Sequence, residues 1–133
     1  MTKIRFAQSE DSGKITTLLN EGFGWDIKNV SADFFNSNNI FCLVAEDMTG
    51  NIIGTATLHI IQKIERHAAQ IEDVVVSKKH RGKKIGQELI KSLVALSKEK
   101  KCYKVTLNTH KETIPFYTRL GFNNEQCQMV LKH

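Results

Sequence analysis

Apolar and polar residues recur along the N-terminal part of this chain with the two periods that distinguish strands from helices. Residues 3–6 alternate between polar and apolar, which predicts a first strand. Apolar residues then recur at helical spacing within 15–19, after N-cap candidates within 9–12. They predict a helix that the glycine-containing stretch 21–25 interrupts, and a second, short helix is expected over 32–35.

The middle of the chain predicts a hairpin, a long strand and a long helix. Residues 41–46 and 51–61 flank a turn-rich stretch and predict the hairpin. Residues 68–76 predict the central strand, and the valine run at its end is typical of a strand buried on both faces. After a basic turn, one helical face carries apolar residues spaced by four, four and three, namely Ile85, Leu89, Leu93 and Leu96.

The C-terminal third predicts a strand over 102–107, a helix over 113–120 and a last strand over 126–131. Pro115 suits the first turn of that helix, and Gly121 suits its end. The predicted order is β-α-α-β-β-β-α-β-α-β. An antiparallel start and one parallel βαβ unit predict an α+β fold, an α/β sandwich with a mixed central sheet and helices on both faces.

The segment from Ile71 to Gly86 carries the most chemistry. A strand runs straight into a short basic turn that opens a helix, so backbone N–H groups and the positive end of the helix dipole point at one place. Gly82 and Gly86 let the backbone approach a ligand closely and adopt positive φ where needed. This arrangement predicts a phosphate site, although it matches neither a nucleotide P-loop nor a dinucleotide-binding glycine pattern. Three side chains add positive charge: Arg81, Lys83 and Lys84.

The same basic run has alternative interpretations. Residues 78–84 hold five Lys or Arg, a density also found in localisation signals, in nucleic-acid patches and on ordinary solvated surfaces. The strand before the run and the helix after it favour the phosphate site. Aromatic residues are not interleaved with the run, as a stacking platform for single-stranded nucleic acid would require, so we expect no nucleic-acid partner. The net charge of +5 suits an anionic ligand of either kind.

Length and composition narrow the class of protein. The 133 residues predict one domain over 1–133. Three cysteines without a CxxC pair are typical of reduced thiols in a cytoplasmic protein. Five histidines show no metal-ligand spacing, so no metal is expected. The N-terminus lacks an apolar leader and no stretch reaches the length of a membrane span, so we expect no membrane contact.

Two motifs together resemble the GNAT family of N-acetyltransferases. The turn Arg81-Gly82-Lys83-Lys84-Ile85-Gly86 stands where that family wraps the pyrophosphate of acetyl-coenzyme A, with Lys84 in place of a usual glycine. The second motif is Phe116-Tyr117-x-x-Leu120-Gly121-Phe122. The resemblance covers the whole chain and implies the GNAT fold, an N-acetyltransferase activity and acetyl-coenzyme A as the co-substrate.

Within the family, the C-terminal half is most similar to the branch that acetylates glucosamine 6-phosphate, a step towards UDP-N-acetylglucosamine. The similar stretches are residues 71–76, 102–107, 114–117 and 128–132. The N-terminal half matches only in outline, and the connection 62–70 is shorter than is usual there. The resemblance implies direct transfer in a ternary complex, and a homodimer whose two chains together complete the sugar site.

The resemblance also assigns roles to individual residues. Tyr117 would lie near the thioester sulfur, and Asn108 stands where an acidic residue is usual. The contacts to acetyl-coenzyme A would come from Val74, Val75, Val76, Arg81, Gly82, Lys83, Lys84, Ile85, Gly86, Gln87, Asn108 and Tyr117. The sugar-phosphate site would be lined by Glu72, Asp73, Tyr103, Lys104 and Lys132, the last acting on the substrate of the partner chain.

Amide formation from a thioester needs a neutral amine, stabilisation of the developing oxyanion and a proton for the departing thiolate. Diverging strand ends beside Val74 would offer an N–H to the oxyanion. We expect Tyr117 to protonate the thiolate and Glu72 to bind the amine or accept its proton. The alternative for Tyr117 is a packed aromatic, for Glu72 a solubilising charge and for Asp73 a capping or pairing role. Cys102 is disfavoured as an acyl carrier, because buried thiols are usually inert.

Other acceptors and another class of function stay open. The same chemistry would serve an aminoalkylphosphonate, a polyamine, an amino acid or a protein terminus, and the basic composition favours the anionic choices. Trp25 would line an acceptor pocket, form a dimer contact or pack in the core, and Arg66 and His67 would meet a phosphate or face solvent. A nucleic-acid or regulatory binding module that uses residues 78–84 is the rival from another class.

Overall fold

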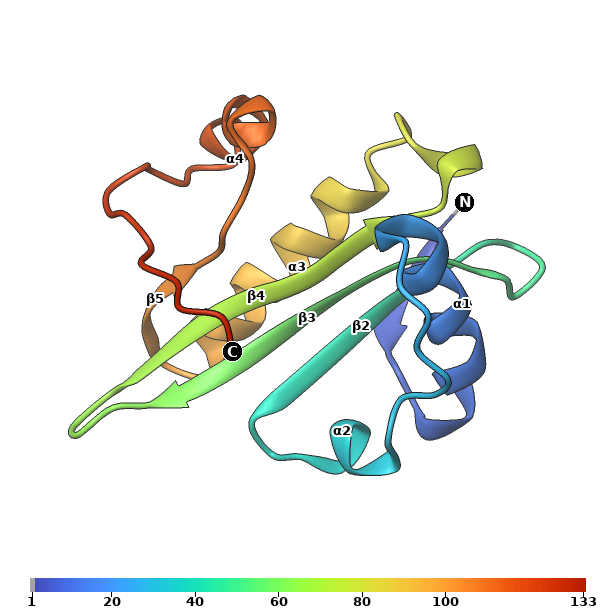
Figure 1. The fold of residues 1–133 in the computed structure, drawn as a ribbon, viewed down its shortest axis with the longest axis horizontal. Coiled ribbons are helices and arrows are strands. Elements are labelled where there is room, and N and C mark those ends of the chain that lie inside the picture. Colours follow the sequence, from blue (N-terminus) through green and yellow to red (C-terminus); the bar gives the residue numbers. More distant parts are fainter. Residues whose placement is uncertain (1) are drawn as a thin grey trace.

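A computed structural model describes residues 2–133, and its strands form one sheet in chain order, β1-β2-β3-β4-β5 (Figure 1). The strands are β1 (Lys3–Phe6), β2 (Ile40–Glu46), β3 (Ile52–Gln62), β4 (His67–Val76) and β5 (Cys102–Thr106). The first four pair antiparallel, and β5 lies parallel to β4. The expectation that the strand ending at Val76 is central was wrong. Because each hairpin adds its next strand to the same edge, β3 becomes the central strand.

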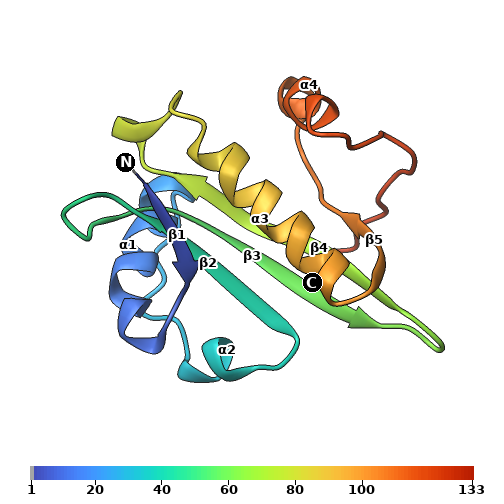
Figure 2. The ribbon, with the colours of Figure 1, turned by 180° about the vertical axis from the view of Figure 1, so that it is seen from behind.

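Helices cover both faces of the sheet, which confirms the predicted α+β sandwich (Figure 1, Figure 2). On one face, Ile15, Leu18 and Leu19 of α1 pack against β2 and β4. On the other face, α3 packs against β2, β3 and β4. The helices are α1 (Ser12–Phe23), α2 (Ala32–Asn36), α3 (Ile85–Glu99) and α4 (Ile114–Arg119).

Helix α3 is buried along the predicted face. Ile85 is 3% exposed, Leu89 and Leu93 are fully buried, and Leu96 is 9% exposed. Each such side chain contributes about 1.5–3 kcal/mol of burial free energy, which fixes the helix on the sheet and with it the turn that precedes it. At the far end of the helix, Lys101 adopts a left-handed φ of 62°.

Helix α1 approaches the sheet closely at a glycine. A Cβ on Gly22 would lie 2.2 Å from Cγ2 of Val75 in β4, far inside van der Waals contact. The helix ends at Gly24, whose φ is 68° and whose N–H donates to the Asn20 carbonyl at 2.9 Å. The glycines of 21–25 therefore provide both the close contact and the end of the helix.

An ion-pair network joins β1 to the start of α1. Arg5 Nη1 lies 2.8 Å from Asp11 Oδ2, and its Nε lies 3.1 Å from Glu46 Oε2. Asp11 is 7% exposed and also accepts from the Gln8 N–H. The hydrogen bond from Arg5 is the main cause that lowers the pKa of Asp11 below its ordinary value, against burial, which acts the other way.

The predicted strand over 126–131 was wrong. Residues 123–133 follow Gly121 (φ 100°) without regular structure, and three apolar side chains of this segment are exposed. Met129 is 93% exposed, Val130 63% and Leu131 78%. A strand requires a neighbour for its N–H and C=O groups, and within residues 2–133 no strand offers this segment one. In the same described range, no helix combines the length and apolar character needed to cross a bilayer.

Candidate active site

The basic turn leaves a group of unused backbone donors at the start of α3. The first helical hydrogen bond runs from the Glu88 N–H to the Lys84 carbonyl at 3.0 Å, so the N–H groups of residues 85–87 have no partner within the helix. Gly82 has φ 84° and Lys84 has φ 64°. These two left-handed residues lie in the turn that leads into α3, so the free N–H groups and the exposed side chains of the basic turn adjoin each other at the start of the helix, as expected for a phosphate site.

Two details of this turn differ from the sequence expectation. Gly86 does not adopt a positive φ, and a Cβ there would lie 3.6 Å from Val76 Cγ2, an ordinary contact. Ile85 faces the core, so only its backbone is available to a ligand. Lys84 takes the left-handed conformation that a glycine would adopt without strain, which explains physically why a glycine suits this position.

Strand β4 extends beyond its parallel neighbour and leaves one edge open. Residues 67–70 pair with β5, whereas the stretch up to Val76 has no partner on that side among residues 2–133 (Figure 1). The Ser77 N–H donates to the Ile53 carbonyl of β3 at 2.8 Å. Because strand N–H groups alternate in direction, the Val76 N–H, and after one further repeat the Val74 N–H, point to the open edge. These are the groups expected to bind the pantetheine arm and thioester carbonyl.

A β-bulge interrupts the pairing of β3 and β4 where the two carboxylates lie. Thr57 is paired with Glu72 and Thr55 with Val75, so β4 has an extra residue between them. The extra residue is accommodated at Asp73, whose φ is 55°. Aspartate tolerates this left-handed conformation better than most residues do. Gln70 Nε2 donates to Glu72 Oε1 at 2.5 Å. The bulge places Glu72 and Asp73 on the α1 side of the sheet.

A cavity of about 260 Å³ lies between this part of the sheet and the segment from α1 to α2. Thr55, Thr57 and Asp73 supply polar groups to it, and Asp73 is the only carboxylate among the described residues that line it. Trp25 and Phe34 are part of the apolar wall. The complete lining is Ile15, Leu19, Trp25, Ile27, Asn29, Val30, Phe34, Cys42, Thr55, Thr57 and Asp73. Trp25 thus lines a pocket, one of the roles considered for it.

The pKa of the Asp73 carboxyl is shifted by its burial and by two neighbouring residues. Burial raises the pKa of its carboxyl, the negative charge of Glu72 raises it further, and the positive charge of His59 on β3 lowers it. The net direction is upward. A carboxyl held this way exchanges a proton more readily near neutral pH than an exposed aspartate does, which suits a group that meets an amine.

Tyr117 stands on α4 with its ring packed and its hydroxyl unengaged. The ring contacts Phe116 and Phe122 edge-on, with centroids 4.9 and 5.8 Å away. Among the described residues the hydroxyl has no hydrogen-bond partner, and it is not sealed from solvent. Burial raises the pKa of Tyr117. The phenol is therefore protonated at neutral pH and free to donate.

The remaining predicted residues are spread more widely. Asn108 lies exposed in the loop after β5, and Lys132 lies in the exposed C-terminal segment. Tyr103 and Lys104 lie at the start of β5, which pairs with the start of β4 and not with the bulge. The guanidinium of Arg66 stacks over the Tyr103 ring at 3.7 Å. Tyr103 and Lys104 lie about 15 Å along the strands from the bulge carboxylates, so these predicted residues form two separate groups.

Sequence reasoning missed Thr57, which lines the cavity, and gave no role to His59, which lies further along the same strand. A single histidine or threonine in an otherwise apolar strand gives no motif. The only signal is that polar residues alternate along 55–59 on one face of a strand that also has a buried face.

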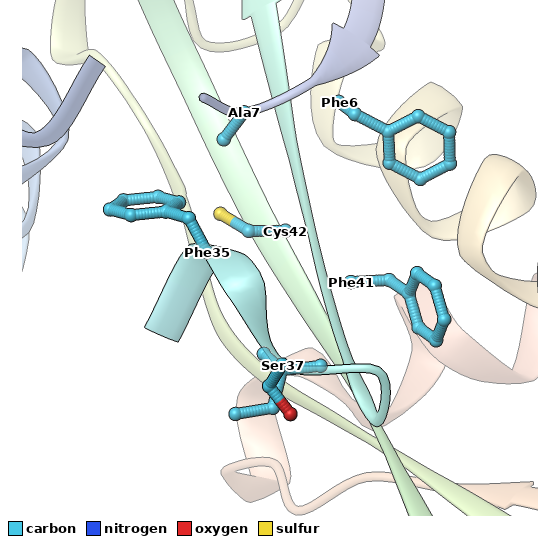
Figure 3. A pocket seen from close by; sticks show the side chains of 7 residues that line it. Phe6, Ala7, Phe35, Ser37, Phe41 and Cys42 are labelled. Carbon is cyan, nitrogen blue, oxygen red and sulfur yellow. The ribbon is translucent and has the colours of Figure 1, made fainter. Parts of the chain in front are cut away.

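A second hollow of about 220 Å³ lies between β1, β2 and α2 (Figure 3). Phe6, Phe35 and Phe41 dominate its wall, and Cys42 borders both hollows. Burial raises the pKa of the Cys42 thiol, so it stays protonated. This hollow has no charged lining among the described residues. Within 2–133, no three His, Cys, Asp or Glu side chains are arranged to hold a metal ion.

This chain is similar in sequence to known acetyltransferases. The model of the acetyltransferase (GNAT) family matches residues 12–122. Glucosamine 6-phosphate N-acetyltransferase of Trypanosoma brucei brucei is 41% identical over 95 residues, which cover 69% of this chain and 63% of that protein. The enzyme of the same name from Arabidopsis thaliana is 34% identical over 98 residues, covering 71% of this chain and 66% of that one. The chain thus spans less than two thirds of these relatives.

Two solved structures superpose on nearly the whole length of this chain. A Trypanosoma brucei acetyltransferase superposes with a TM-score of 0.90 at 32% identity and covers 100% of both chains. The Arabidopsis thaliana glucosamine-6-phosphate N-acetyltransferase superposes with a TM-score of 0.84 at 30% identity, covering 99% of this chain and 98% of that chain. The overall α+β fold is therefore shared with these proteins.

Proposed function

Because the chain belongs to the GNAT acetyltransferase family, we propose that it transfers acetyl from acetyl-coenzyme A to the amine of glucosamine 6-phosphate. One observation carries the proposal. Strand β4 combines an open edge next to the unused N–H groups of α3 with two carboxylates on its α1 side, and both features meet at the bulge. A donor along the edge and an acceptor in the cavity would therefore meet at one point.

The residues present suit acetyl-coenzyme A. The N–H groups of residues 85–87, with Arg81, Lys83 and Lys84 around them, would bind the pyrophosphate. The open-edge N–H groups of Val74 and Val76 would bind the pantetheine arm and polarise the thioester carbonyl. When bound, acetyl-coenzyme A supplies the activated acetyl group. Backbone donors fixed in a strand need no reorganisation, which is what makes such stabilisation effective.

On the acceptor side, two carboxylates of this chain would bind the ammonium group of the substrate and remove its proton. Glu72 and Asp73 would bind the ammonium and take up the proton that the amine must lose, directly or through water. We place Tyr117 as the donor of the proton that the departing thiolate needs, because its hydroxyl is protonated and unengaged. Direct transfer with both substrates bound follows, since positioning them together lowers the entropic cost of the reaction.

The sugar phosphate requires cations at a distance from the amine. Lys104 of β5, and Arg66 of the β3–β4 turn stacked on Tyr103, supply cations away from the bulge, which supports a phosphate end there. The basic pI of about 9.2 favours an anionic acceptor over a polyamine. The names of the relatives support the same acceptor. The product would feed the synthesis of UDP-N-acetylglucosamine, and three free cysteines suit a reducing compartment such as the cytoplasm.

A homodimer is the second part of the proposal. The apolar residues Met129 to Leu131 have no cover among the described residues, and β5 is an open edge of the sheet. An exposed apolar segment beside an open edge favours strand addition between two copies, which would bring Lys132 to the partner's acceptor site. Val130→Asp should give a monomer by light scattering with weaker acceptor binding, whereas Ile64→Asp, at a fully exposed hairpin tip, should remain a dimer. A wild-type monomer at assay concentrations would refute this part.

The activity is tested by coenzyme A release, followed with a thiol-reactive dye. The acceptors compared are glucosamine 6-phosphate, unphosphorylated glucosamine, an aminoalkylphosphonate and spermidine. Release that is at least about tenfold faster with glucosamine 6-phosphate, by kcat/KM, supports the proposal. Faster release with another amine would refute the acceptor, and no release with any would refute the activity. Salt-sensitive nucleic-acid binding without coenzyme A affinity would indicate a binding module instead.

A further inference from the structure

An aromatic side chain borders the acceptor cavity with much of its surface exposed. Trp25 lines this cavity together with Asp73, which the proposed function assigns to the amine. The tryptophan is nonetheless 45% exposed in the free protein. The exposed part of such a large apolar ring gains burial free energy only when a ligand or a partner covers it. Trp25 is therefore placed to contact a molecule that fills the cavity.

Contacts with α1 hold the indole in place before any ligand binds. Phe23, the last residue of α1, packs against it with ring centroids 4.7 Å apart and an interplanar angle of 32°. Phe23 is not part of the cavity lining, so it supports the indole without filling the cavity. After Trp25, the side-chain amide of Asn20 bonds to both the N–H and the carbonyl of Ile27, each at 3.0 Å. The chain is thus fixed before and after Trp25, and a surface held in advance loses little entropy on binding.

The same segment offers a polar group to the cavity. Asn29 lines the cavity, and its Oδ1 accepts from the Ser12 hydroxyl at 2.5 Å and from the Val30 N–H at 3.2 Å. Because a backbone N–H only donates, the Asn29 atom that faces it is the oxygen, and the amide NH2 group is left to donate to a ligand. An aromatic surface and an amide donor in one cavity suit a sugar ring, whose C–H groups form apolar faces and whose hydroxyls accept hydrogen bonds.

We propose that Trp25 is a specificity-determining residue of the acceptor site: its indole packs against the sugar ring of the acceptor and favours amino sugars over linear amines. The inference rests on the proposed function, in which carboxylates bind the amine and cations away from the bulge meet the phosphate. The uncharged ring between those two groups is the part of the substrate that needs an apolar surface. Trp25 has no role in binding acetyl-coenzyme A. The alternative is that Trp25 only packs against Phe23 or contacts a second copy of the chain.

The kinetic test compares Trp25→Ala, which removes the indole, with Trp25→Phe, which retains an aromatic surface. The acceptors are glucosamine 6-phosphate and a linear aminoalkylphosphonate, which has an amine and an anionic group but no ring; if the linear amine is not turned over, its Ki as a competing ligand is measured instead. In Trp25→Ala, kcat/KM for the sugar should fall about three- to tenfold, whereas the value for the linear amine and the KM for acetyl-coenzyme A should not change.

Two variants serve as controls for this comparison. Trp25→Phe should retain most of the activity on the sugar, because an aromatic ring still covers it. Met48→Ala, in the exposed turn between β2 and β3, should match the wild type with both acceptors. An equal loss on the sugar and on the linear amine in Trp25→Ala, or no loss on the sugar, would overturn the proposal.

Fluorescence gives a readout that does not depend on turnover, because Trp25 is the single tryptophan of the chain. With coenzyme A present, which has no acetyl group to transfer, saturating glucosamine 6-phosphate should shift the emission to shorter wavelength, since the sugar displaces water from the indole. The linear amine should leave the emission unchanged. Turnover of the sugar with unchanged emission would overturn the role of Trp25 and retain the proposed function. An emission shift with the sugar but no activity on it would retain the contact and refute the proposed function instead.

Discussion

Replacing Lys84 by glycine should make the protein more stable and its pyrophosphate site weaker. Lys84 caps α3 with φ 64° and ψ 17°, where a side chain with a Cβ costs about 1–2 kcal/mol. Glycine removes this strain but adds about 0.5–1 kcal/mol of chain entropy to the unfolded state. The net gain is about 0.5–1 kcal/mol. With an unfolding entropy of about 2.1 cal/mol/K per residue, this raises the Tm of a 133-residue domain by about 2–4 °C.

The chain offers a matched control at the other end of the same helix. Lys101 has φ 62° and follows the last turn of α3, so Lys101→Gly should raise the Tm by a similar amount. A helix of 15 residues places Lys101 about 22 Å from the basic turn, so the affinity for acetyl-coenzyme A should not change in this variant.

The two variants are compared by calorimetry and by titration with acetyl-coenzyme A. Lys84→Gly should bind up to about fivefold more weakly at low salt, the effect of one exposed charge, and the difference should shrink as salt is added. A lower Tm in Lys84→Gly would refute the strain. Equal binding by both variants at low salt would show that the Lys84 side chain does not reach the pyrophosphate.

Three further predictions concern the remaining elements. Tyr117→Phe should lower kcat by about 10²- to 10⁴-fold with unchanged Tm and acetyl-coenzyme A affinity, since the ring packing stays; unchanged turnover in stopped-flow assays would remove Tyr117 from the mechanism. The folded pKa of Asp11 is lowered, so its stabilisation is present above the unfolded value of 3.8 and is lost as pH falls through the folded value. Arg5→Met should cost about 2 kcal/mol in urea unfolding at pH 7 and flatten that dependence, and an equally steep pH curve would contradict it. Gly22→Ala should destabilise by about 1–3 kcal/mol through its clash with Val75, and Val75→Ala should recover part of the loss; additive losses would argue against the contact.

The sequence predicts the parts of this fold that local pattern determines. The apolar spacing of α3 made its buried face predictable, and the valine run placed the end of β4. The prediction of a last strand was wrong because the alternation of polar and apolar residues over 126–131 indicates only a preference for extended chain. A strand also needs a neighbouring strand to pair with. The order of strands in the sheet depends likewise on pairing between distant residues, which no local pattern specifies.

The candidate site was predictable only where it lies in continuous sequence. The turn from Arg81 to Gly86 and the Phe116–Phe122 segment are short motifs, and Tyr117 came with the second. The extra residue that turns Asp73 towards the cavity is invisible in the sequence, because a bulge is defined by the register of β3 against β4. Thr57 was missed for the same reason: it reaches the cavity because of how β3 pairs with β4, and alone it is one polar residue in a strand.

The open edge of β4 makes neighbouring amides of one strand differ in hydrogen exchange. The Ser77 amide is hydrogen-bonded to β3, whereas the Val76 amide faces the unpaired side. In the free protein, Val76 and Val74 should therefore exchange with deuterium much faster than Ser77, and acetyl-coenzyme A should slow those two amides selectively. Each amide of the strand edge thus becomes a separate reporter of donor occupancy, readable before any acceptor is known.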